Sequence, residues 1–146
     1  MKAVDTNILV YAHREDSPFH ERALALLLDL ANGSARWAIP WPCVHEFIAV
    51  VTHPRIYDPP SPLEVALDAM ETWIDSPMCE MVGEGPGYFV DLRKLATAAH
   101  VAGPMIHDAR IAAICAHNGV SELLSADRDF SRFDKLRTRN PLVERA

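Results

Sequence analysis

The sequence contains few cysteines, no long apolar run and no excess of basic residues. The three cysteines among 146 residues form no CxxC pair. This excludes a zinc knuckle or a redox dithiol and is typical of buried free thiols in a reducing compartment. No apolar run approaches the length of a membrane span, and no secretory signal is recognisable. We therefore expect a cytoplasmic protein that does not associate with a membrane.

Basic residues are also too few to indicate a nucleic-acid partner. The chain has 14 Lys and Arg against 20 Asp and Glu, a net charge of -6, whereas phosphate binding normally appears as a basic excess. The acidic excess is confined to one part of the chain. Residues 1–127 carry 8 basic and 17 acidic side chains, whereas residues 128–146 carry 6 basic and 3 acidic side chains. The basic C-terminal segment is either a solvated tail or a rim that contacts phosphate, and both interpretations remain open.

Several common functional motifs are missing as well. The chain has no GxGxxG, no GxxxxGK[ST], no GxSxG and no HExxH. Their absence disfavours dinucleotide binding, P-loop nucleotide hydrolysis, serine-hydrolase chemistry and zincin-type proteolysis.

What is present is the composition and periodicity of an α/β protein. With 49% hydrophobic and 23% charged residues, the chain is expected to form a single domain over residues 1–146. Short apolar strands are predicted at 3–4, 37–39, 79–82 and 122–125, alternating with helices at 8–12, 18–31, 42–51, 62–74, 89–102 and 106–117. Ser17-Pro18 and Ser61-Pro62-Leu63-Glu64 are interpreted as helix starts, the second as a capping box. This alternation predicts a mainly parallel sheet.

Acidic residues follow the predicted strands. Asp5 ends the first strand, Asp127 and Asp129 follow the fourth, and Glu46 and Asp108 lie in the first turns of helices. Because ligands collect at the carboxyl ends of parallel strands, these side chains are expected to meet. Clustered carboxylates repel one another unless a cation such as Mg²⁺ or Mn²⁺ neutralises them, which indicates a metal-dependent hydrolase. The alternative, that each acid only caps a helix or a turn, remains open on spacing alone.

Four segments resemble, in order, the motifs of PIN-domain ribonucleases, particularly VapC-type toxins of bacterial toxin–antitoxin pairs. They are VDTNILVY at 4–11, PCVHEF at 42–47, IHDARIAA at 106–113 and LSADRDF at 124–130. The resemblance spans nearly the whole chain. It implies a PIN-like three-layer α/β/α sandwich with a short-stranded, mainly parallel central sheet, and a metal-dependent endoribonuclease that hydrolyses phosphodiester bonds in RNA.

The resemblance also implies residue roles. The catalytic acids, which would bind Mg²⁺ or Mn²⁺, are Asp5, Glu46, Asp108 and Asp127, with Asp5 and Asp108 as the most direct ligands. Supporting hydrogen bonds are expected from Thr6, Asn7 and Ser125, the last standing where many members have Thr. Asp129 is a further acid, acting beside or instead of Asp127.

The partners implied are a cognate VapB-like antitoxin, an RNA substrate and a second copy of the chain in a homodimer. The helices at 19–30 and 44–51 are expected docking surfaces for the antitoxin. A catalytically inactive PIN-like module that binds RNA or protein is the main alternative, and the presence of all four acids disfavours it. A haloacid-dehalogenase-like phosphatase is disfavoured because Asn7 stands where that chemistry needs a second Asp.

Overall fold

The fold is built on a sheet of five short parallel strands. A computed structural model of the chain describes residues 1–143. The strands are β1 (Lys2–Val4), β2 (Trp37–Pro40), β3 (Cys79–Val82), β4 (Glu122–Leu124) and β5 (Arg137–Arg139), in the spatial order β3-β2-β1-β4-β5. All four pairings are parallel, with Ala3 opposite Ala38 on one side and Leu123 on the other.

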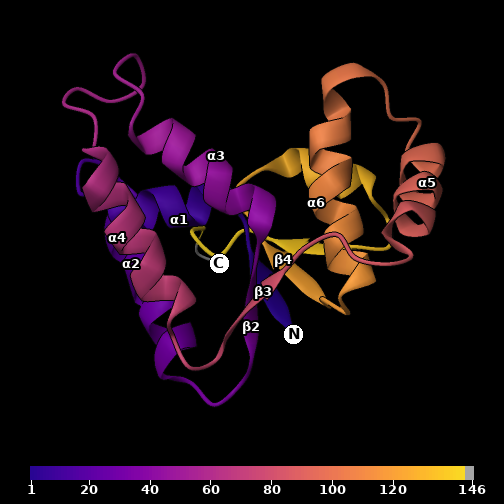
Figure 1. Cartoon of the computed structure of the whole chain (residues 1–146), viewed down its shortest axis with the longest axis horizontal. Helices are drawn as coiled ribbons and strands as arrows, with labels where there is room; N and C mark the ends of the chain where they lie inside the picture. Colours follow the sequence, from indigo (N-terminus) through magenta and orange to yellow (C-terminus); the bar gives the residue numbers. More distant parts are fainter. Residues whose placement is uncertain (144–146) are drawn as a thin grey trace.

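Helices cover both sides of this sheet, which gives the three-layer α/β/α sandwich expected from the sequence. The helices are α1 (Thr6–His13), α2 (His20–Asn32), α3 (Trp41–Val51), α4 (Leu63–Ile74), α5 (Tyr88–Ala98) and α6 (Ile106–His117), with short 3₁₀ turns η1 (Gly103–Met105) and η2 (Arg128–Arg132). Helices α1 to α4 gather on one side of the sheet and α5 and α6 pack together on the other (Figure 1). Within the described residues, no helix is long and apolar enough to cross a membrane.

The central strands are apolar because both of their faces are covered. Ala3 and Val4 of β1 and Leu123 and Leu124 of β4 are completely buried. Strands of a parallel sheet under helices on both faces are typically continuous apolar runs of this kind. Burial of these short runs leaves their carboxyl ends as the first positions where polar side chains can face solvent.

The strand order places a crevice between β1 and β4. The chain moves from β1 outward to β2 and β3, then returns to the other side of β1 to form β4 and β5. Connections that diverge from two neighbouring strands leave a ligand-binding crevice at the carboxyl ends of those strands. The residues that follow β1 and β4 are Asp5 and Ser125, and the main-chain N–H of Asp5 continues the ladder by donating to the carbonyl of Leu124 at 3.0 Å.

Two local predictions were wrong, and one strand was not predicted. Helix α2 begins at His20 with Phe19 as its N-cap, not at Ser17-Pro18, and the Ser17 hydroxyl instead accepts from the Phe19 N–H in a turn before the helix. Helix α4 begins after Pro62 and has no side-chain cap, so the predicted capping box does not form. Strand β5 was not predicted, because its Arg-Thr-Arg sequence has no apolar signature. Glu144 and Arg145 of the predicted basic segment lie outside the described residues.

Candidate active site

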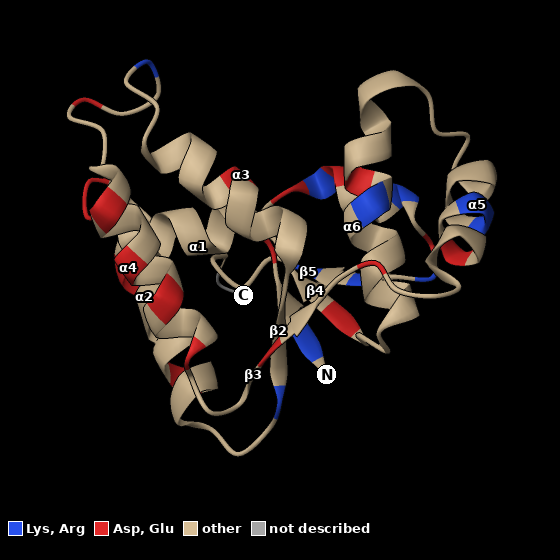
Figure 2. Cartoon of the chain, viewed as in Figure 1, with Lys and Arg blue, Asp and Glu red and all other residues tan. Residues whose placement is uncertain are grey.

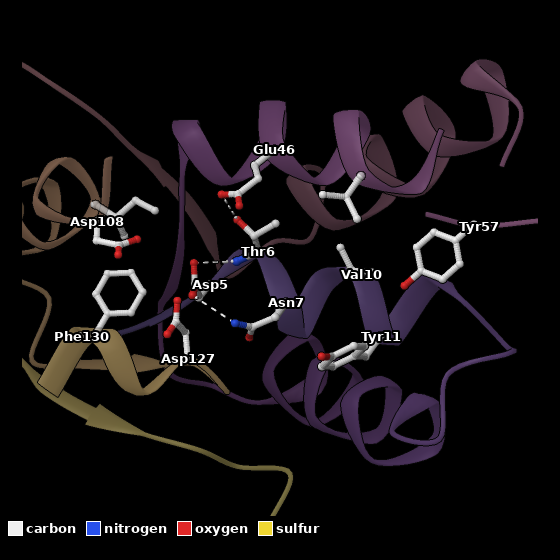
Figure 3. A pocket seen from close by; sticks show the side chains of 12 residues that line it. Asp5, Thr6, Asn7, Val10, Tyr11, Glu46, Tyr57, Asp108, Asp127 and Phe130 are labelled. Atoms are coloured by element: carbon white, nitrogen blue, oxygen red, sulfur yellow. Dashed lines mark hydrogen bonds between the residues drawn. The ribbon is translucent and has the colours of Figure 1, made fainter. Parts of the chain in front are cut away.

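A cavity of about 220 Å³ opens at the carboxyl ends of β1 and β4. Acidic side chains occupy one end of it and two tyrosines the other (Figure 3). Its lining residues are Asp5, Thr6, Asn7, Val10, Tyr11, Glu46, Val50, Tyr57, Asp108, Ile111, Asp127 and Phe130. All four acids predicted as catalytic are in this set, although the first and the last are 122 positions apart in sequence. The fold therefore brings the predicted quartet to one cavity.

Asp5 lies at the centre of a hydrogen-bond network. As N-cap of α1 it accepts from the main-chain N–H of Thr6 at 2.8 Å through Oδ1. Its Oδ2 accepts from the Ser125 hydroxyl at 2.7 Å and from Asn7 Nδ2 at 3.3 Å. The helix-cap interpretation of Asp5 is thus correct, and the same carboxylate also lines the cavity. Its several donors fix the orientation of this carboxylate.

Cys43 adds a contact to Asp5 that sequence reasoning did not identify. Its Sγ donates to Asp5 Oδ1 at 3.6 Å, and the thiol is completely buried. Burial next to the Asp5 carboxylate raises the pKa of Cys43, so the thiol stays protonated and remains a donor. Spacing could have suggested the contact, because Cys43 lies one helical turn before Glu46. An isolated apolar-flanked cysteine nevertheless gives no signal that separates it from a core residue.

The environment of Asp5 and Asp108 raises the pKa of both carboxyls. The pKa of Asp5 is raised from 3.8 to about 6, mainly by burial and to a smaller extent by the nearby Glu46 carboxylate. The hydrogen bonds that Asp5 accepts act in the opposite direction and limit this rise. Burial also raises the pKa of Asp108, with further contributions from Asp127, Asp129 and Glu46. Raised pKa values at clustered acids in a cavity are a physical signature of a functional site.

Glu46 and Asp127 are each positioned by a neighbour from another part of the site. The Thr6 hydroxyl donates to Glu46 Oε2 at 3.0 Å, which joins α1 to α3 across the cavity. Asp127 donates its main-chain N–H to Ser125 Oγ at 2.9 Å and, as the cap of η2, accepts from the Asp129 N–H at 2.8 Å. Thr6 and Ser125 therefore contact the acids directly, and the Thr6 hydroxyl bonds Glu46 while its main-chain N–H bonds Asp5.

The donor set fits a hard divalent cation. None of the residues that line the cavity is Lys, Arg or His. Arg132, outside this lining, lowers the pKa of Asp108 but does not outweigh the effects that raise it. Oxygen atoms of Asp108, Asp127 and Asp129 all lie within 4.8 Å of one another, and they are the one set of three potential ligands this close in residues 1–143. Carboxylate oxygens are the ligands preferred by Mg²⁺ and Mn²⁺. Asp129 is thus brought to the cluster, while Asp5 and Glu46 approach the cavity from its other walls.

A second cleft, of about 490 Å³, adjoins the cavity between α3 and the start of α6. The two share Glu46, Asp108 and Ile111, so they meet at the carboxylates. The second cleft is also lined by His45, His107 and Arg110, the last paired with Glu84. The acidic site therefore opens in two directions.

Comparison with known sequences places the chain in a described family. Residues 2–136 match the family model "PIN domain". Ribonuclease VapC43 of Mycobacterium tuberculosis is 37% identical over 142 residues, which cover 97% of this chain and 96% of the relative. Ribonuclease VapC48 of the same species is 33% identical over 137 residues, or 94% of each chain.

Solved structures show the same fold at lower identity. The VapBC2 complex from Rickettsia felis, bound to a DNA fragment from its promoter, matches with a TM-score of 0.70 and 18% identity over 95% of this chain and 97% of that one. The sarcin–ricin-loop-cleaving toxin VapC20 of Mycobacterium tuberculosis matches with a TM-score of 0.65 and 14% identity over 90% and 93%. These likenesses support the fold described above.

Proposed function

Since the chain belongs to the PIN-domain family and is a homologue of the VapC ribonucleases, we propose that it is a toxin endoribonuclease whose acidic cavity acts with a divalent cation. The observation that carries the metal dependence is the convergence of Asp5, Glu46, Asp108 and Asp127 on one cavity that no basic side chain lines. The residue roles follow from this placement. The single-domain organisation over residues 1–146 and the cytoplasmic location stay predictions.

Asp5 and Asp108 would hold the cation, with Asp127 and Glu46 beside them in the lining of the cavity. When bound, Mg²⁺ or Mn²⁺ supplies an activated water and offsets the charge that develops on a phosphodiester. Hydrogen bonds from Ser125, Asn7 and Thr6 keep the Asp5 carboxylate in place without a rearrangement during the reaction. Glu46 is held by Thr6 at the junction of the two clefts, where it can accept a proton from the attacking water.

The two openings favour internal cleavage of RNA. A strand that enters by the tyrosine end can leave between α3 and α6 with its scissile phosphate at the carboxylates. A closed pocket would instead hold only a chain end. We also propose a VapB-like antitoxin as the inhibitor, since solved neighbours of the same fold are VapBC complexes. The predicted homodimer stays a proposal.

The test compares the purified wild-type chain with Asp5→Ala and Asp108→Asn on a circular single-stranded RNA. Wild type with Mn²⁺ or Mg²⁺ should open the circle, EDTA should abolish the reaction, and both variants should lose at least 100-fold in rate. Glu71→Gln, on the exposed face of α4, is the matched control and should cleave normally. Expression of wild type but not of Asp5→Ala should arrest growth.

The proposal is overturned if wild type leaves the circle intact with both metals, or if Asp5→Ala cleaves as fast as wild type. Cleavage that persists in EDTA would remove the metal from the mechanism. A catalytically inactive binding module would retain RNA on a filter in all variants without cutting it.

A further inference from the structure

The cavity has an aromatic end that the acidic chemistry does not use. Tyr11 from α1 and Tyr57 from the loop at 52–62 line this end, with Val10 between them and the acids (Figure 3). Both tyrosine hydroxyls point into the cavity in this view. Neither forms a hydrogen bond within residues 1–143. These two rings therefore present an apolar surface and unused polar atoms to whatever occupies the cavity.

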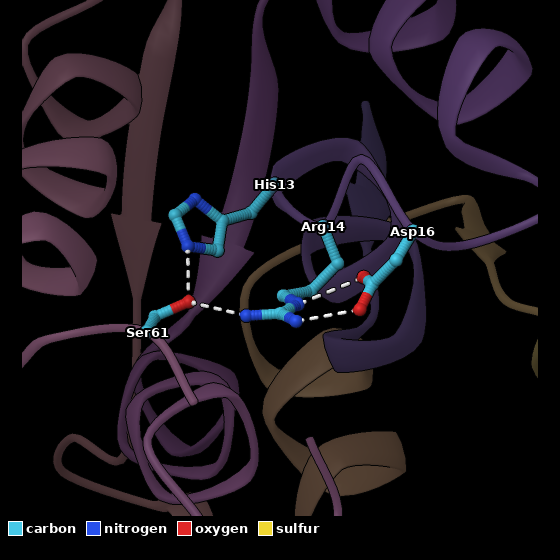
Figure 4. Close-up of polar contacts among 4 residues, drawn as sticks. All are labelled: His13, Arg14, Asp16 and Ser61. Atoms are coloured by element: carbon cyan, nitrogen blue, oxygen red, sulfur yellow. Dashed lines mark hydrogen bonds and ion pairs between the residues drawn. The ribbon is translucent and has the colours of Figure 1, made fainter. Parts of the chain in front are cut away.

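Tyr57 is held in position although it belongs to a loop. The guanidinium carbon of Arg14 lies 4.2 Å from the centre of the Tyr57 ring. Arg14 is itself fixed by two contacts to Asp16, at 2.9 and 2.6 Å, and by a hydrogen bond to Ser61 Oγ at 3.2 Å (Figure 4). One face of the Tyr57 ring is therefore covered by a cation that Asp16 neutralises.

The far end of the loop is fixed to the same cluster. Ser61 Oγ lies 2.9 Å from His13 Nε2, and the Ser61 N–H donates to the carbonyl of Val51 at 2.8 Å. His13 in turn packs edge-on against Phe47 in the core. Because the loop is closed onto α1 and α3 at this point, the Tyr57 ring is ordered before any ligand arrives. A preordered aromatic surface binds a ligand at low entropic cost.

The charges on the elements around this end are mainly acidic. Helix α4, which follows the loop, carries Glu64, Asp68 and Glu71 and no basic residue (Figure 2). The guanidinium of Arg14, which lies against Tyr57, is paired with Asp16, and Arg55 of the same loop is exposed. A nucleobase, in contrast, is neutral and has an aromatic face. Proteins that bind single-stranded RNA place bases on aromatic side chains and contact base edges with polar groups.

We propose that Tyr57 is a specificity-determining residue, against which a nucleobase flanking the scissile phosphate stacks. The proposal rests on the proposed function, because it takes RNA as the substrate. Arg14 occupies one face of the ring, the base packs on the remaining exposed surface, and Tyr11 forms the opposite wall. The Tyr57 ring selects for a base that stacks well, and its contribution appears in substrate binding and not in the chemical step.

The experiment pairs protein variants with altered substrates. Wild type, Tyr57→Leu and Tyr57→Phe are assayed with Mn²⁺ on an RNA oligonucleotide containing one cleavage site of the wild-type enzyme. The same oligonucleotide is then made with a single abasic nucleotide at each position around that site. Tyr88→Leu, which removes a partly buried tyrosine from α5 outside the cavity, is the matched control. The Mn²⁺-induced rise in Tm reports folding and metal binding for each variant.

On intact RNA, Tyr57→Leu should raise KM by about 10- to 100-fold with little change in kcat, as expected for the loss of one stacked base. Tyr57→Phe should retain most of the affinity, because the ring remains. When the base is missing at one position, the KM of wild type should rise to that of Tyr57→Leu on intact RNA. The same missing base should not raise the KM of Tyr57→Leu any further. The Mn²⁺-induced rise in Tm should be the same in all variants.

Two outcomes overturn the assignment alone. In the first, Tyr57→Leu cleaves as wild type does. In the second, the rise in KM caused by Tyr57→Leu and the rise caused by the missing base are independent and multiply at every position tested. Tyr57 would then be a structural element of the loop and not a contact to a base. A wild-type chain that cleaves no RNA overturns the proposed function and this assignment with it, so the two failures are distinguishable.

Discussion

Ser125 donates its hydroxyl hydrogen to Asp5 across the neighbouring ends of β4 and β1. The Ser125 oxygen also receives hydrogen bonds from the Asp127 N–H at 2.9 Å and from Asn7 Nδ2 at 3.2 Å. Because both of these groups are donors only, the one hydroxyl hydrogen is left for Asp5 Oδ2 at 2.7 Å. A single buried hydroxyl thus connects Asp5 and Asn7 of the first sequence motif to Asp127 of the fourth.

Removal of this hydroxyl should therefore impair both activity and stability. Ser125→Ala leaves buried partners unsatisfied, and we expect a loss of about 1–3 kcal/mol in the free energy of unfolding together with at least a 10-fold fall in kcat. Ser125→Thr keeps the hydroxyl and should retain most of both. Urea denaturation and RNA cleavage measure the two effects. Ser131→Ala, exposed in η2, is the control, and equal activity of the Ala and Thr variants would contradict the network.

The raised pKa of Asp5 predicts how the stability of the metal-free protein depends on pH. A folded-state pKa of about 6 against 3.8 for the free side chain means that the folded protein binds this proton more tightly than the unfolded chain does. The contribution of Asp5 is therefore fully present below about pH 4 and is lost as the pH rises through 6. The loss amounts to about 3 kcal/mol at one pKa unit per 1.36 kcal/mol.

Asp5→Asn isolates this effect, because the amide cannot ionise. The free energy of unfolding of wild type, measured relative to that of Asp5→Asn in EDTA, should fall between pH 4 and pH 7. Added Mn²⁺ should restore wild type at pH 7 and leave the variant unchanged. A difference between the two proteins that stays constant with pH would show that the Asp5 pKa is close to that of a free carboxyl.

The sequence was sufficient to predict that the four acids meet, because each acid occupies a position set by local structure. Asp5 follows a buried strand, Asp127 follows another, and Glu46 and Asp108 lie in early helical turns. The parallel sheet then dictates that these positions converge. The motifs also contain Thr6, Asn7 and Ser125, whose side chains donate hydrogen bonds to Glu46 or Asp5.

The aromatic end of the cavity could not be predicted in the same way. Tyr57 lies in a proline-rich loop without periodicity, and its position depends on Arg14 and Ser61, which are paired only in the tertiary structure. Ser61 shows how a local signal fails. The spacing of Ser61 to Glu64 favours a capping box. The Ser61 hydroxyl instead forms hydrogen bonds with His13 and Arg14 and does not cap the helix. Strand β5 was missed because pairing with β4, and not apolar residues, makes it a strand.

Asp127 and Asp129 should differ in their contribution to catalysis. Asp127 lines the cavity and is partly buried, whereas Asp129 is exposed and contributes only to the three-carboxylate set with Asp108. We expect Asp127→Asn to reduce kcat by at least 100-fold and Asp129→Asn by about 10-fold or less. Asn can still cap η2 in the first variant, so circular dichroism should show both proteins folded. A greater loss for Asp129→Asn would make that residue the fourth acid.

The Ser61 cluster should contribute to stability independently of the metal site. Arg14 can only donate, so it donates to Ser61 Oγ, and the Ser61 hydroxyl hydrogen is then directed to His13 Nε2. Burial lowers the pKa of His13, which favours the neutral ring that this bond requires. Ser61→Ala removes the hydrogen bonds of the Ser61 hydroxyl to His13 and Arg14. We expect the free energy of unfolding to fall by about 1–2 kcal/mol as a result.

Limited proteolysis should then cut the 52–62 loop of Ser61→Ala faster than that of wild type, because the loop is released from α1. The Mn²⁺-induced rise in Tm should be unchanged, since the contacts of Asp5 and Asp108 are not altered. Ser34→Ala, exposed in the turn before β2, is the matched control for a serine whose loss should have no effect. Equal stability and equal cleavage rates for the two alanine variants would show that the loop is held by its other contacts, and Tyr57 would then keep its position without Ser61.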